Sequence, residues 1–546
     1  MRGESDGTTK APLPVARGRG PVRLPGGSSV TLEPADPRDS PPPKLSIQAV
    51  GKRLTKETGM VFGGTVLLKG VTIISSIILA RLLGASALGT WAVVTATGGM
   101  AWVLAELGLG AATVRIVAQA KEDERERVKA ETTALYLALL VGAGVIGSFA
   151  ALTPLLAAEL YRLPETLPLF LLLCVSMFFT LGPNIFTSVL QAHRRIGVMA
   201  VTSLGLGILH AVGLVIGAWT LGLPGAFLSA LVLAVLSWGV YWWQLRDGRS
   251  WSRRDFDRGM ARRFLALGLP TVVSTLLISL GAWLALTFLT LKVLASGPGV
   301  LDVVGEYSVA WRVAAFLAFP ASALFVVLFP FASEVFHRDQ ELFAGTFRHT
   351  TRYTLLGAVP LSFVFVLLAP EIVGLLYGQG FSEAGPLLSL LVAGGFLAAL
   401  TPWGSMLFYV SDSMLDATKV YSLAVMLQIG VAAALIPPLG ALGLVVATLT
   451  YQFAVISLAP LFLRGKQGQA DLARAYAWAS GAAVGLLAVG LLSQGWPLLL
   501  RIVALAALLG SYAAILHGLV MTPGDRRFLR SLLRGLARRI GLGQRP

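Results

Sequence analysis

Long apolar stretches recur along almost the whole chain, and short polar or basic segments separate them. A helix that crosses a bilayer needs about 20 predominantly apolar residues. The fourteen stretches of this kind are 60–80, 88–112, 132–152, 167–190, 198–219, 222–243, 265–290, 303–331, 350–369, 384–409, 418–436, 440–462, 475–493 and 498–520. The pattern predicts an all-α polytopic membrane protein, and the even number of crossings places both termini on the same side.

Short motifs of the first half return in the second half at a nearly constant offset. Gly89 and Gly305 each open a predicted helix and lie 216 residues apart, as do Tyr161 and Tyr377 after predicted helices 3 and 9. Two further matches are Leu221-Gly222 with Leu439-Gly440, offset by 218, and Pro183 with Pro402, offset by 219. Chance recurrence of common Gly and Pro turns is the alternative. An even six helices per repeat predicts a parallel repeat, typical of transporters in which two lobes rock about a central site.

The pattern divides the chain into six predicted segments. They are a tail at 1–57, an N-lobe of helices 1–6 at 58–243, a basic cytoplasmic loop at 244–264, a C-lobe of helices 7–12 at 265–463, helices 13 and 14 at 464–522, and a basic cytoplasmic tail at 523–546. The first tail is polar, is rich in Pro and Gly, and lacks the apolar segment of a signal peptide, so we expect it to be disordered. The last tail carries seven arginines, which favour a short amphipathic helix on the membrane surface.

The distribution of lysine and arginine predicts the orientation in the membrane. With the N-terminus inside, 38 of the 44 basic residues fall on cytoplasmic segments, whereas Arg81, Arg162, Lys292 and Arg501 fall outside. We therefore expect both termini to be cytoplasmic. The net charge of +16 then reflects topology and not a nucleic-acid partner. With 55% hydrophobic and 13% charged residues, the composition excludes an ordinary cytosolic enzyme.

Two basic residues remain, and both lie within predicted spans. Lys69 and Arg312 each lie about nine residues into a helix, on opposite lobes. An ionisable side chain at this depth is costly and is a functional candidate by default. Arginine binds phosphate with a bidentate fork and lysine with a point charge. The pair suits an anionic substrate such as a diphosphate, with a structural ion pair or a snorkelling chain as the alternative.

Other polar residues within spans are weaker candidates for substrate binding. Glu106 can pair with Lys69 or contact substrate, and His210 can titrate near neutral pH. Asn184 can bond sugar hydroxyls, although amides more often join helices. Each of these three has a purely structural alternative.

Several classes of function lack their motifs in this chain. There is no Walker A sequence for nucleotide hydrolysis and no zinc-binding histidine pair. The single cysteine, Cys174, excludes an internal disulfide and a cysteine-rich metal site. The predicted external loops are too short to hold the acid–base or metal chemistry of a glycosyltransferase. We therefore expect no catalytic centre and no cofactor.

Several short motifs occur in a fixed order along 58–520. They are Ala80-Arg81-Leu82-Leu83-Gly84, Leu88-Gly89, Glu106-Leu107-Gly108-Leu109 with Arg115, Leu328-Phe329-Pro330, and Ala369-Pro370-Glu371 to Tyr377-Gly378. In these motifs the chain resembles bacterial polysaccharide flippases of the O-antigen type, which belong to the multidrug, oligosaccharidyl-lipid and polysaccharide exporter (MOP) superfamily. The resemblance implies two six-helix lobes around a cation-lined cavity. It also implies a multi-pass protein of the bacterial inner membrane that flips polyprenyl-diphosphate-linked glycans beside membrane lipids and other polysaccharide assembly proteins.

The resemblance also implies roles for three residues. Lys69 lies twelve residues before Arg81 and matches a helix 1 cation of the related lipid II flippases, with lysine for arginine. Arg312 matches their helix 8 cation, and Glu106 matches an acidic cavity position, so the three would contact the diphosphate or the first sugars. One departure is that 265–290 has no carboxylate where helix 7 of many relatives carries one. This absence puts ion coupling through that position in doubt.

Three other functions remain open from the sequence. An ion-coupled multidrug antiporter of the same superfamily needs buried carboxylates, whereas the central charges here are mostly basic. A membrane polysaccharide polymerase needs a catalytic external loop. A non-transporting scaffold leaves the two mid-membrane cations without a purpose.

Overall fold

The computed structural model describes residues 57–120, 123–193, 195–246, 251–297, 301–336 and 338–516. The predicted disorder of the first tail and the predicted surface helix after Pro523 concern residues outside this part of the chain. Residues 54–546 form one compact unit, to which everything below refers.

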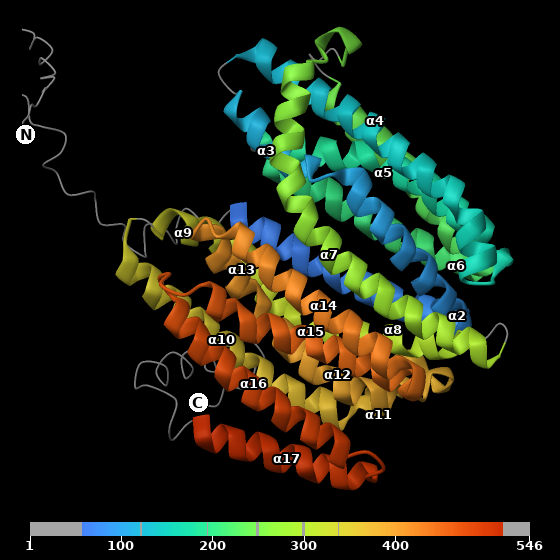
Figure 1. The fold of residues 1–546 in the computed structure, drawn as a ribbon, viewed down its shortest axis with the longest axis vertical. Coiled ribbons are helices and arrows are strands. Elements are labelled where there is room, and N and C mark those ends of the chain that lie inside the picture. The colour runs from blue at the N-terminus through green and yellow to red at the C-terminus, as the bar shows by residue number, and fades with distance from the viewer. Residues whose placement is uncertain are drawn as a thin grey trace, which may run out of the picture. The chain divides into compact units, whose positions relative to one another are not determined.

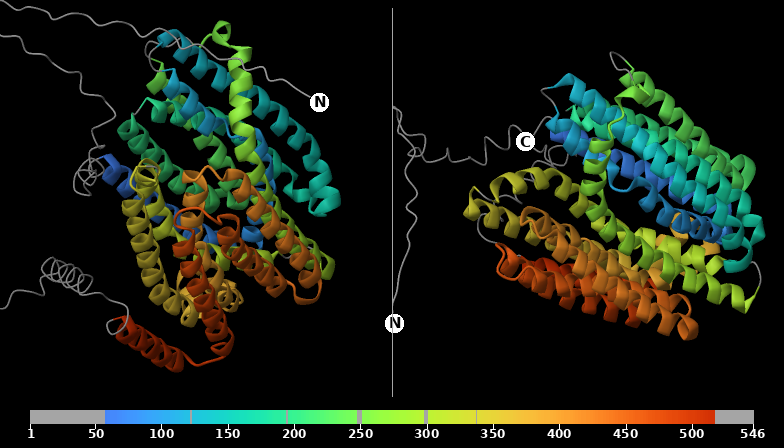
Figure 2. Two further views of the ribbon diagram at one scale, coloured as in Figure 1. Left: turned by 60° about the vertical axis from the view of Figure 1, so that its left-hand side comes forward. Right: turned by 45° about the horizontal axis from the view of Figure 1, so that its top comes forward.

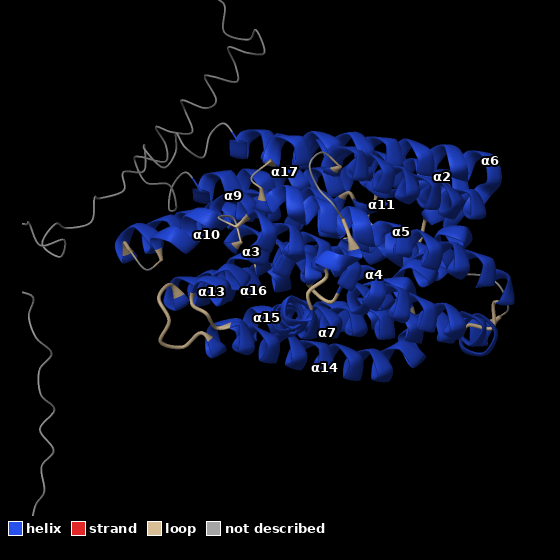
Figure 3. Cartoon of the chain, turned by 90° about the horizontal axis from the view of Figure 1, so that it is seen from above, coloured by secondary structure: helices blue, strands red, loops and turns tan. Residues whose placement is uncertain are grey.

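Every regular element of the described residues is a helix, as the prediction of an all-α protein requires (Figure 1). Figure 3 shows most of these helices running side by side along one common direction, as expected for a membrane bundle. The helices are α2 (Glu57–Glu106), α3 (Leu109–Gln119), α4 (Glu124–Leu155), α5 (Leu167–Ala192), α6 (Ile196–Leu245), α7 (Arg258–Ser296), α8 (Asp302–Ala315), α9 (Phe319–Val335), α10 (Gln340–Leu367), α11 (Ala369–Tyr377), α12 (Ala384–Ala398), α13 (Thr401–Val410), α14 (Met414–Leu439), α15 (Ala441–Phe462), α16 (Gln469–Leu492) and α17 (Leu498–Ile515).

Twelve stretches of the described residues are long and apolar enough to span a membrane. Two of them, Leu67–Gln119 and Gly197–Leu245, have 53 and 49 residues, about twice the length of one crossing. Each contains a sharp bend at a glycine with positive φ, Gly84 at 77° and Gly222 at 64°. An L-residue is strained in this conformation whereas glycine is not. Since each bend divides its stretch into two crossings, the twelve stretches account for the fourteen predicted spans.

The helices form two lobes, and α7 belongs to both. In Figure 1 helices α3–α6 gather apart from the yellow to red helices α9–α17, while the blue helix α2 runs alongside the latter group. Phe264 of α7 is buried in an N-lobe core cluster with Leu109 and Phe186, whereas Leu289 near the other end of α7 is buried in the large core cluster that joins the C-lobe to part of the N-lobe. The predicted boundary put 258–264 in a loop, but these residues are the first two turns of α7. In the sequence, Phe264 and its buried neighbours lie among arginines, so they do not form a recognisable apolar run.

The last two helices extend the C-lobe beyond the predicted repeat. Figure 2 shows α17 at the margin of this lobe in both views. Arg501 of α17 donates through Nη1 to the two carboxylate oxygens of Glu371 in α11, at 3.0 and 3.2 Å. This ion pair attaches the last helix to the motif Ala369-Pro370-Glu371.

The two lobes touch backbone to backbone where α8 crosses α2 just beyond the Gly84 bend. A Cβ atom on Gly89 would collide with the backbone of Leu301, and one on Gly305 would collide with the carbonyl oxygen of Ala85. Nearby, Arg81 donates to the carbonyl oxygens of Leu375 and Leu376 at the end of α11, with 2.8 Å from Nε to Leu376. The lobes are thus closed against each other at this end, which we call the Gly84 end.

Candidate functional site

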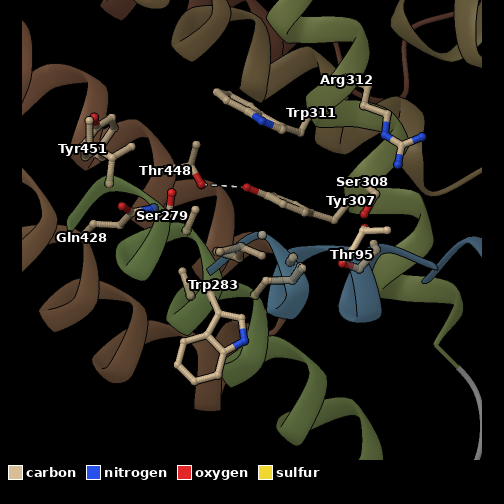
Figure 4. A pocket seen from close by; sticks show the side chains of 18 of the residues that line it. Thr95, Ser279, Trp283, Tyr307, Ser308, Trp311, Arg312, Gln428, Thr448 and Tyr451 are labelled. Atoms are coloured by element: carbon tan, nitrogen blue, oxygen red, sulfur yellow. Dashed lines mark hydrogen bonds between the residues drawn. The ribbon is translucent and has the colours of Figure 1, made fainter. Parts of the chain in front are cut away.

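A central cavity of about 560 Å³ lies between the two lobes. Its walls come from the second arm of α2 (85–106), from α7 and α8, and from α14 and α15 (Figure 4). The polar and aromatic side chains that line it are Thr95, Ser279, Trp283, Tyr307, Ser308, Trp311, Arg312, Gln428, Thr448, Tyr451 and Gln452. Arg312 is the only charged residue among the described residues of this lining.

Arg312 is held in the central cavity by the packing of α8. It lies one helical turn beyond Ser308, and the hydroxyl of Tyr307 meets that of Thr448 in α15 at 2.7 Å, a bond drawn dashed in Figure 4. Arg312 is half-buried, and none of the ion pairs among the described residues includes it. A guanidinium offers five donors in a planar fork. The cavity therefore presents a cation that no carboxylate neutralises, as an anionic ligand requires.

A hydrogen-bond cluster joins the lobes beside this cavity. Trp283 of α7 donates through Nε1 to the hydroxyls of Thr97 and Tyr161, at 3.0 and 3.2 Å. Tyr161 also meets Thr97 at 2.8 Å and Thr287 of α7 at 3.2 Å. These residues are largely buried. Opening the boundary between the lobes to water would disrupt all four hydrogen bonds. The repeat marks Tyr161, but nothing in the sequence pattern singles out Trp283 or Thr287.

The repeat partner of Tyr161, Tyr377, lies at the end of α11, where the C-lobe meets the first arm of α2 (57–83). There Arg81 of α2 donates to the carbonyl oxygens of Leu375 and Leu376. The end of α11 is thus a second place at which the two lobes are joined by hydrogen bonds.

A second cavity, of about 370 Å³, lies inside the N-lobe between α2, α5 and α6. It brings together two of the predicted site residues, Asn184 and His210, with His210 exposed toward it. Asn184 donates through Nδ2 to a carboxylate oxygen of Glu106 at 3.2 Å. Glu106 therefore belongs with the N-lobe cavity and not with Arg312.

Lys69 stands apart from both cavities. It is exposed on the first arm of α2 (57–83), and the described linings of the two cavities do not include it. None of the ion pairs among the described residues joins it to Glu106, so the suggested Lys69–Glu106 pairing is absent from this structure. The five predicted site residues are thus distributed over three places. Within the described ranges, no three His, Cys, Asp or Glu side chains are arranged to hold a metal ion.

Comparisons with known proteins agree on the kind of molecule. The profile of a family described as polysaccharide biosynthesis protein matches residues 78–386, which is more than half of the chain. No curated protein matches the sequence significantly.

Solved structures share the fold at low sequence identity. An inward-facing multidrug resistance MATE family transporter of the MOP superfamily is 15% identical, with a TM-score of 0.59 over 76% of this chain and 94% of that one. A MOP superfamily transporter from Pyrococcus furiosus, described by the reverse polarity of its binding pocket, is 15% identical with a TM-score of 0.54 over 80% and 96%. An outward-facing MATE transporter is 18% identical with a TM-score of 0.50 over 81% and 99%.

Proposed function

Because the chain belongs to the polysaccharide biosynthesis protein family and has the two-lobed fold of MOP superfamily transporters, we propose that it moves a polyprenyl-diphosphate-linked oligosaccharide across the bacterial inner membrane. Family and fold are those of membrane transporters and flippases. Our proposal adds the identity of the substrate, the membrane in which the protein lies and the direction in which the substrate moves. Movement proceeds by alternating access, with the two lobes rocking about the central cavity.

The observation that carries this proposal is the unneutralised cation of the central cavity. A half-buried guanidinium is costly unless it is paired with an anion. The central lining offers no carboxylate among the described residues, so the anion comes with the ligand. A diphosphate matches the fork of Arg312, while the apolar polyprenyl chain stays in the surrounding lipid.

Lys69 offers a second cation on the first arm of α2. This arm contacts the C-lobe at the end of α11, where Arg81 donates to the carbonyl oxygens of Leu375 and Leu376. Lys69 is exposed and lies twelve residues before Arg81, or roughly 18 Å along the axis. We assign it the first contact with the diphosphate on entry.

We propose that the structure represents an inward-facing state. The lobes are closed at the Gly84 end by the Gly89 and Gly305 crossings, and the distribution of basic residues favours placing that end outside. The overlap with the inward-facing MATE transporter, with a TM-score of 0.59, exceeds that with the outward-facing one, at 0.50. In this state the substrate enters from the cytoplasmic side.

A deletion strain tests the function. Polyprenyl-linked glycans are extracted, and an impermeant glycan-modifying reagent reports which leaflet holds them. We expect finished precursor to accumulate in the inner leaflet and to be restored to the outer leaflet by the wild type. The double variant Lys69→Gln, Arg312→Gln should fail to restore it. The matched control Lys292→Gln removes an exposed cation at the far end of α7 and should restore it fully.

Each contrary outcome identifies another function. Precursor that reaches the outer leaflet but stays unpolymerised would indicate a polymerase. Unchanged lipid-linked glycans together with increased drug sensitivity would indicate a multidrug antiporter.

A further inference from the structure

The cavity inside the N-lobe has a chemical character different from that of the central cavity. Its polar lining consists of hydroxyls, an amide and an imidazole, with two aromatic rings. These side chains are Trp102, Thr180, Asn184, Thr187, Ser203, His210, Ser237 and Tyr241. The carboxylate of Glu106 accepts a hydrogen bond from the side-chain amide of Asn184. The described lining thus contains no aspartate, glutamate, lysine or arginine.

Such a lining suits an uncharged ligand rich in hydroxyl groups. Hydroxyl and amide side chains both donate and accept hydrogen bonds, as the hydroxyls of a sugar require. Trp102 also lines the cavity, and an indole ring can pack against the C–H side of a pyranose. At about 370 Å³ the cavity falls within the range of about 300–1,000 Å³ that is usual for small-molecule sites.

One face of α2 connects this cavity to the central one. Thr95 and Gly99 line the central cavity, Trp102 lines the N-lobe cavity, and Glu106 follows one turn later. Spacings of four, three and four residues place all of them on one side of the helix. From Gly99 to Glu106 is seven residues, or roughly 10 Å along the axis. A ligand that reached from Arg312 to the N-lobe cavity would therefore lie along this face of α2.

We infer that the N-lobe cavity is a neutral-sugar subsite, which receives the first sugars of a glycan whose diphosphate is held at Arg312. This inference rests on the proposed function and adds a division of labour to it. The cation of the C-lobe binds the charged group, and the N-lobe binds the uncharged one. One substrate then bridges the two lobes along the second arm of α2.

The test compares lipids that differ only in the sugar. The full chain in lipid nanodiscs is titrated with polyprenyl diphosphate, and then with the same lipid carrying one glucose, one galactose or one N-acetylglucosamine. In the variant Thr187→Val with His210→Ala, we expect at least one glycosylated lipid to bind about tenfold more weakly, the usual effect of losing one or two hydrogen bonds. Binding of the lipid without sugar should change by less than twofold. Thr220→Ala, on the same helix as His210 but outside the cavity, should alter neither.

Arg312→Gln separates this inference from the function on which it rests. That variant should weaken the binding of lipids with sugar and of lipids without sugar to the same extent. An equal loss for both kinds of lipid in the Thr187, His210 variant would overturn the subsite, as would no loss for any glycosylated lipid. Either result leaves the flippase proposal standing. If the wild-type chain binds none of the lipids, both the function and the subsite are wrong.

A second measurement uses the natural glycan without naming it in advance. A photo-cross-linking residue replaces Leu206, which lines the N-lobe cavity, or Trp219, which is 75% exposed on the same helix. In cells that make the polysaccharide, we expect carbohydrate to be captured at position 206 and only lipid at position 219. Carbohydrate captured equally at both positions, or at neither, would contradict the subsite.

Discussion

At the scale of single residues, the most informative side chain is Arg312. It lies on α8, which the Tyr307–Thr448 hydrogen bond joins to α15, and the described lining of its cavity holds no carboxylate. The sequence identifies it as a costly cation at mid-depth, and the structure places it in a cavity between the lobes. The chemistry of its guanidinium then becomes directly testable.

Replacing the planar guanidinium of Arg312 by the point charge of lysine should separate the effect of hydrogen-bond geometry on binding from the effect of charge. We expect Arg312→Lys to weaken the binding of polyprenyl diphosphate about tenfold, because lysine keeps the charge but loses bidentate hydrogen bonding. Arg312→Gln should weaken it further, since it removes the charge as well. Titration of the two variants in nanodiscs measures both effects. Wild-type affinity in the Gln variant would show that the diphosphate binds elsewhere.

At the scale of the elements, glycines decide where helices bend and where they touch. The bends at Gly84 and Gly222 turn two long helices into four crossings. Sequence periodicity predicts such crossings well, because a crossing requires an apolar segment and periodicity reports which segments are apolar. It cannot predict the contact of Gly89 with Leu301, since two surfaces 212 residues apart in sequence must first be brought together.

A single methyl group at this crossing should open the Gly84 end. In Gly89→Ala the added Cβ meets the backbone of Leu301, which cannot rotate away as a side chain can. We expect the lobes to separate there, so that a thiol reporter at that end, Ser86→Cys with the buried Cys174 changed to Ser, reacts faster with an impermeant reagent. Gly99→Ala is the matched control on the same helix, because its Cβ would meet nothing within 4 Å. Equal reactivity in the two variants would show that the crossing does not close this end.

At the scale of the whole molecule, the sequence predicts which segments are helices, but it does not predict which side chains face one another. Fourteen crossings and two lobes follow from apolar periodicity and from the repeat, and the structure agrees. Of the predicted site residues, Arg312 lies in the central cavity, Asn184, His210 and Glu106 gather at the N-lobe cavity, and Lys69 lies in neither. Depth within a helix can be read from the sequence, whereas the direction in which a side chain points depends on how the lobes pack.

The attachment of the last helix offers a test of assembly. Arg501 is largely buried and Glu371 about a third exposed in their ion pair. Arg501→Leu leaves the carboxylate without its cation, and we expect a loss of about 1–3 kcal/mol in the free energy of unfolding. This should appear as a Tm several degrees lower in detergent. Adding Glu371→Leu should restore part of the loss, because no unpaired charge then remains.

A surface ion pair provides the control for that experiment. Arg348 and Asp471 meet at 3.2 Å, with the arginine side chain 64% exposed. Arg348→Leu should therefore change the free energy of unfolding by less than about 1 kcal/mol. A similar Tm loss in Arg348→Leu and Arg501→Leu would contradict the structural role of the Glu371–Arg501 pair.

The contact at the Gly84 end has the form of a symmetric dimer interface. Ala85 and Leu301 are 216 residues apart, as are Gly89 and Gly305. Gly89 meets Leu301 and Gly305 meets Ala85, so each half gives its partner the same patch that it receives. This reciprocity is the pattern of a two-fold symmetric interface, in which each side presents the same patch. The two halves of one chain thus contact each other here as the two subunits of a C2 dimer do, and each of the two crossings depends on its own glycine.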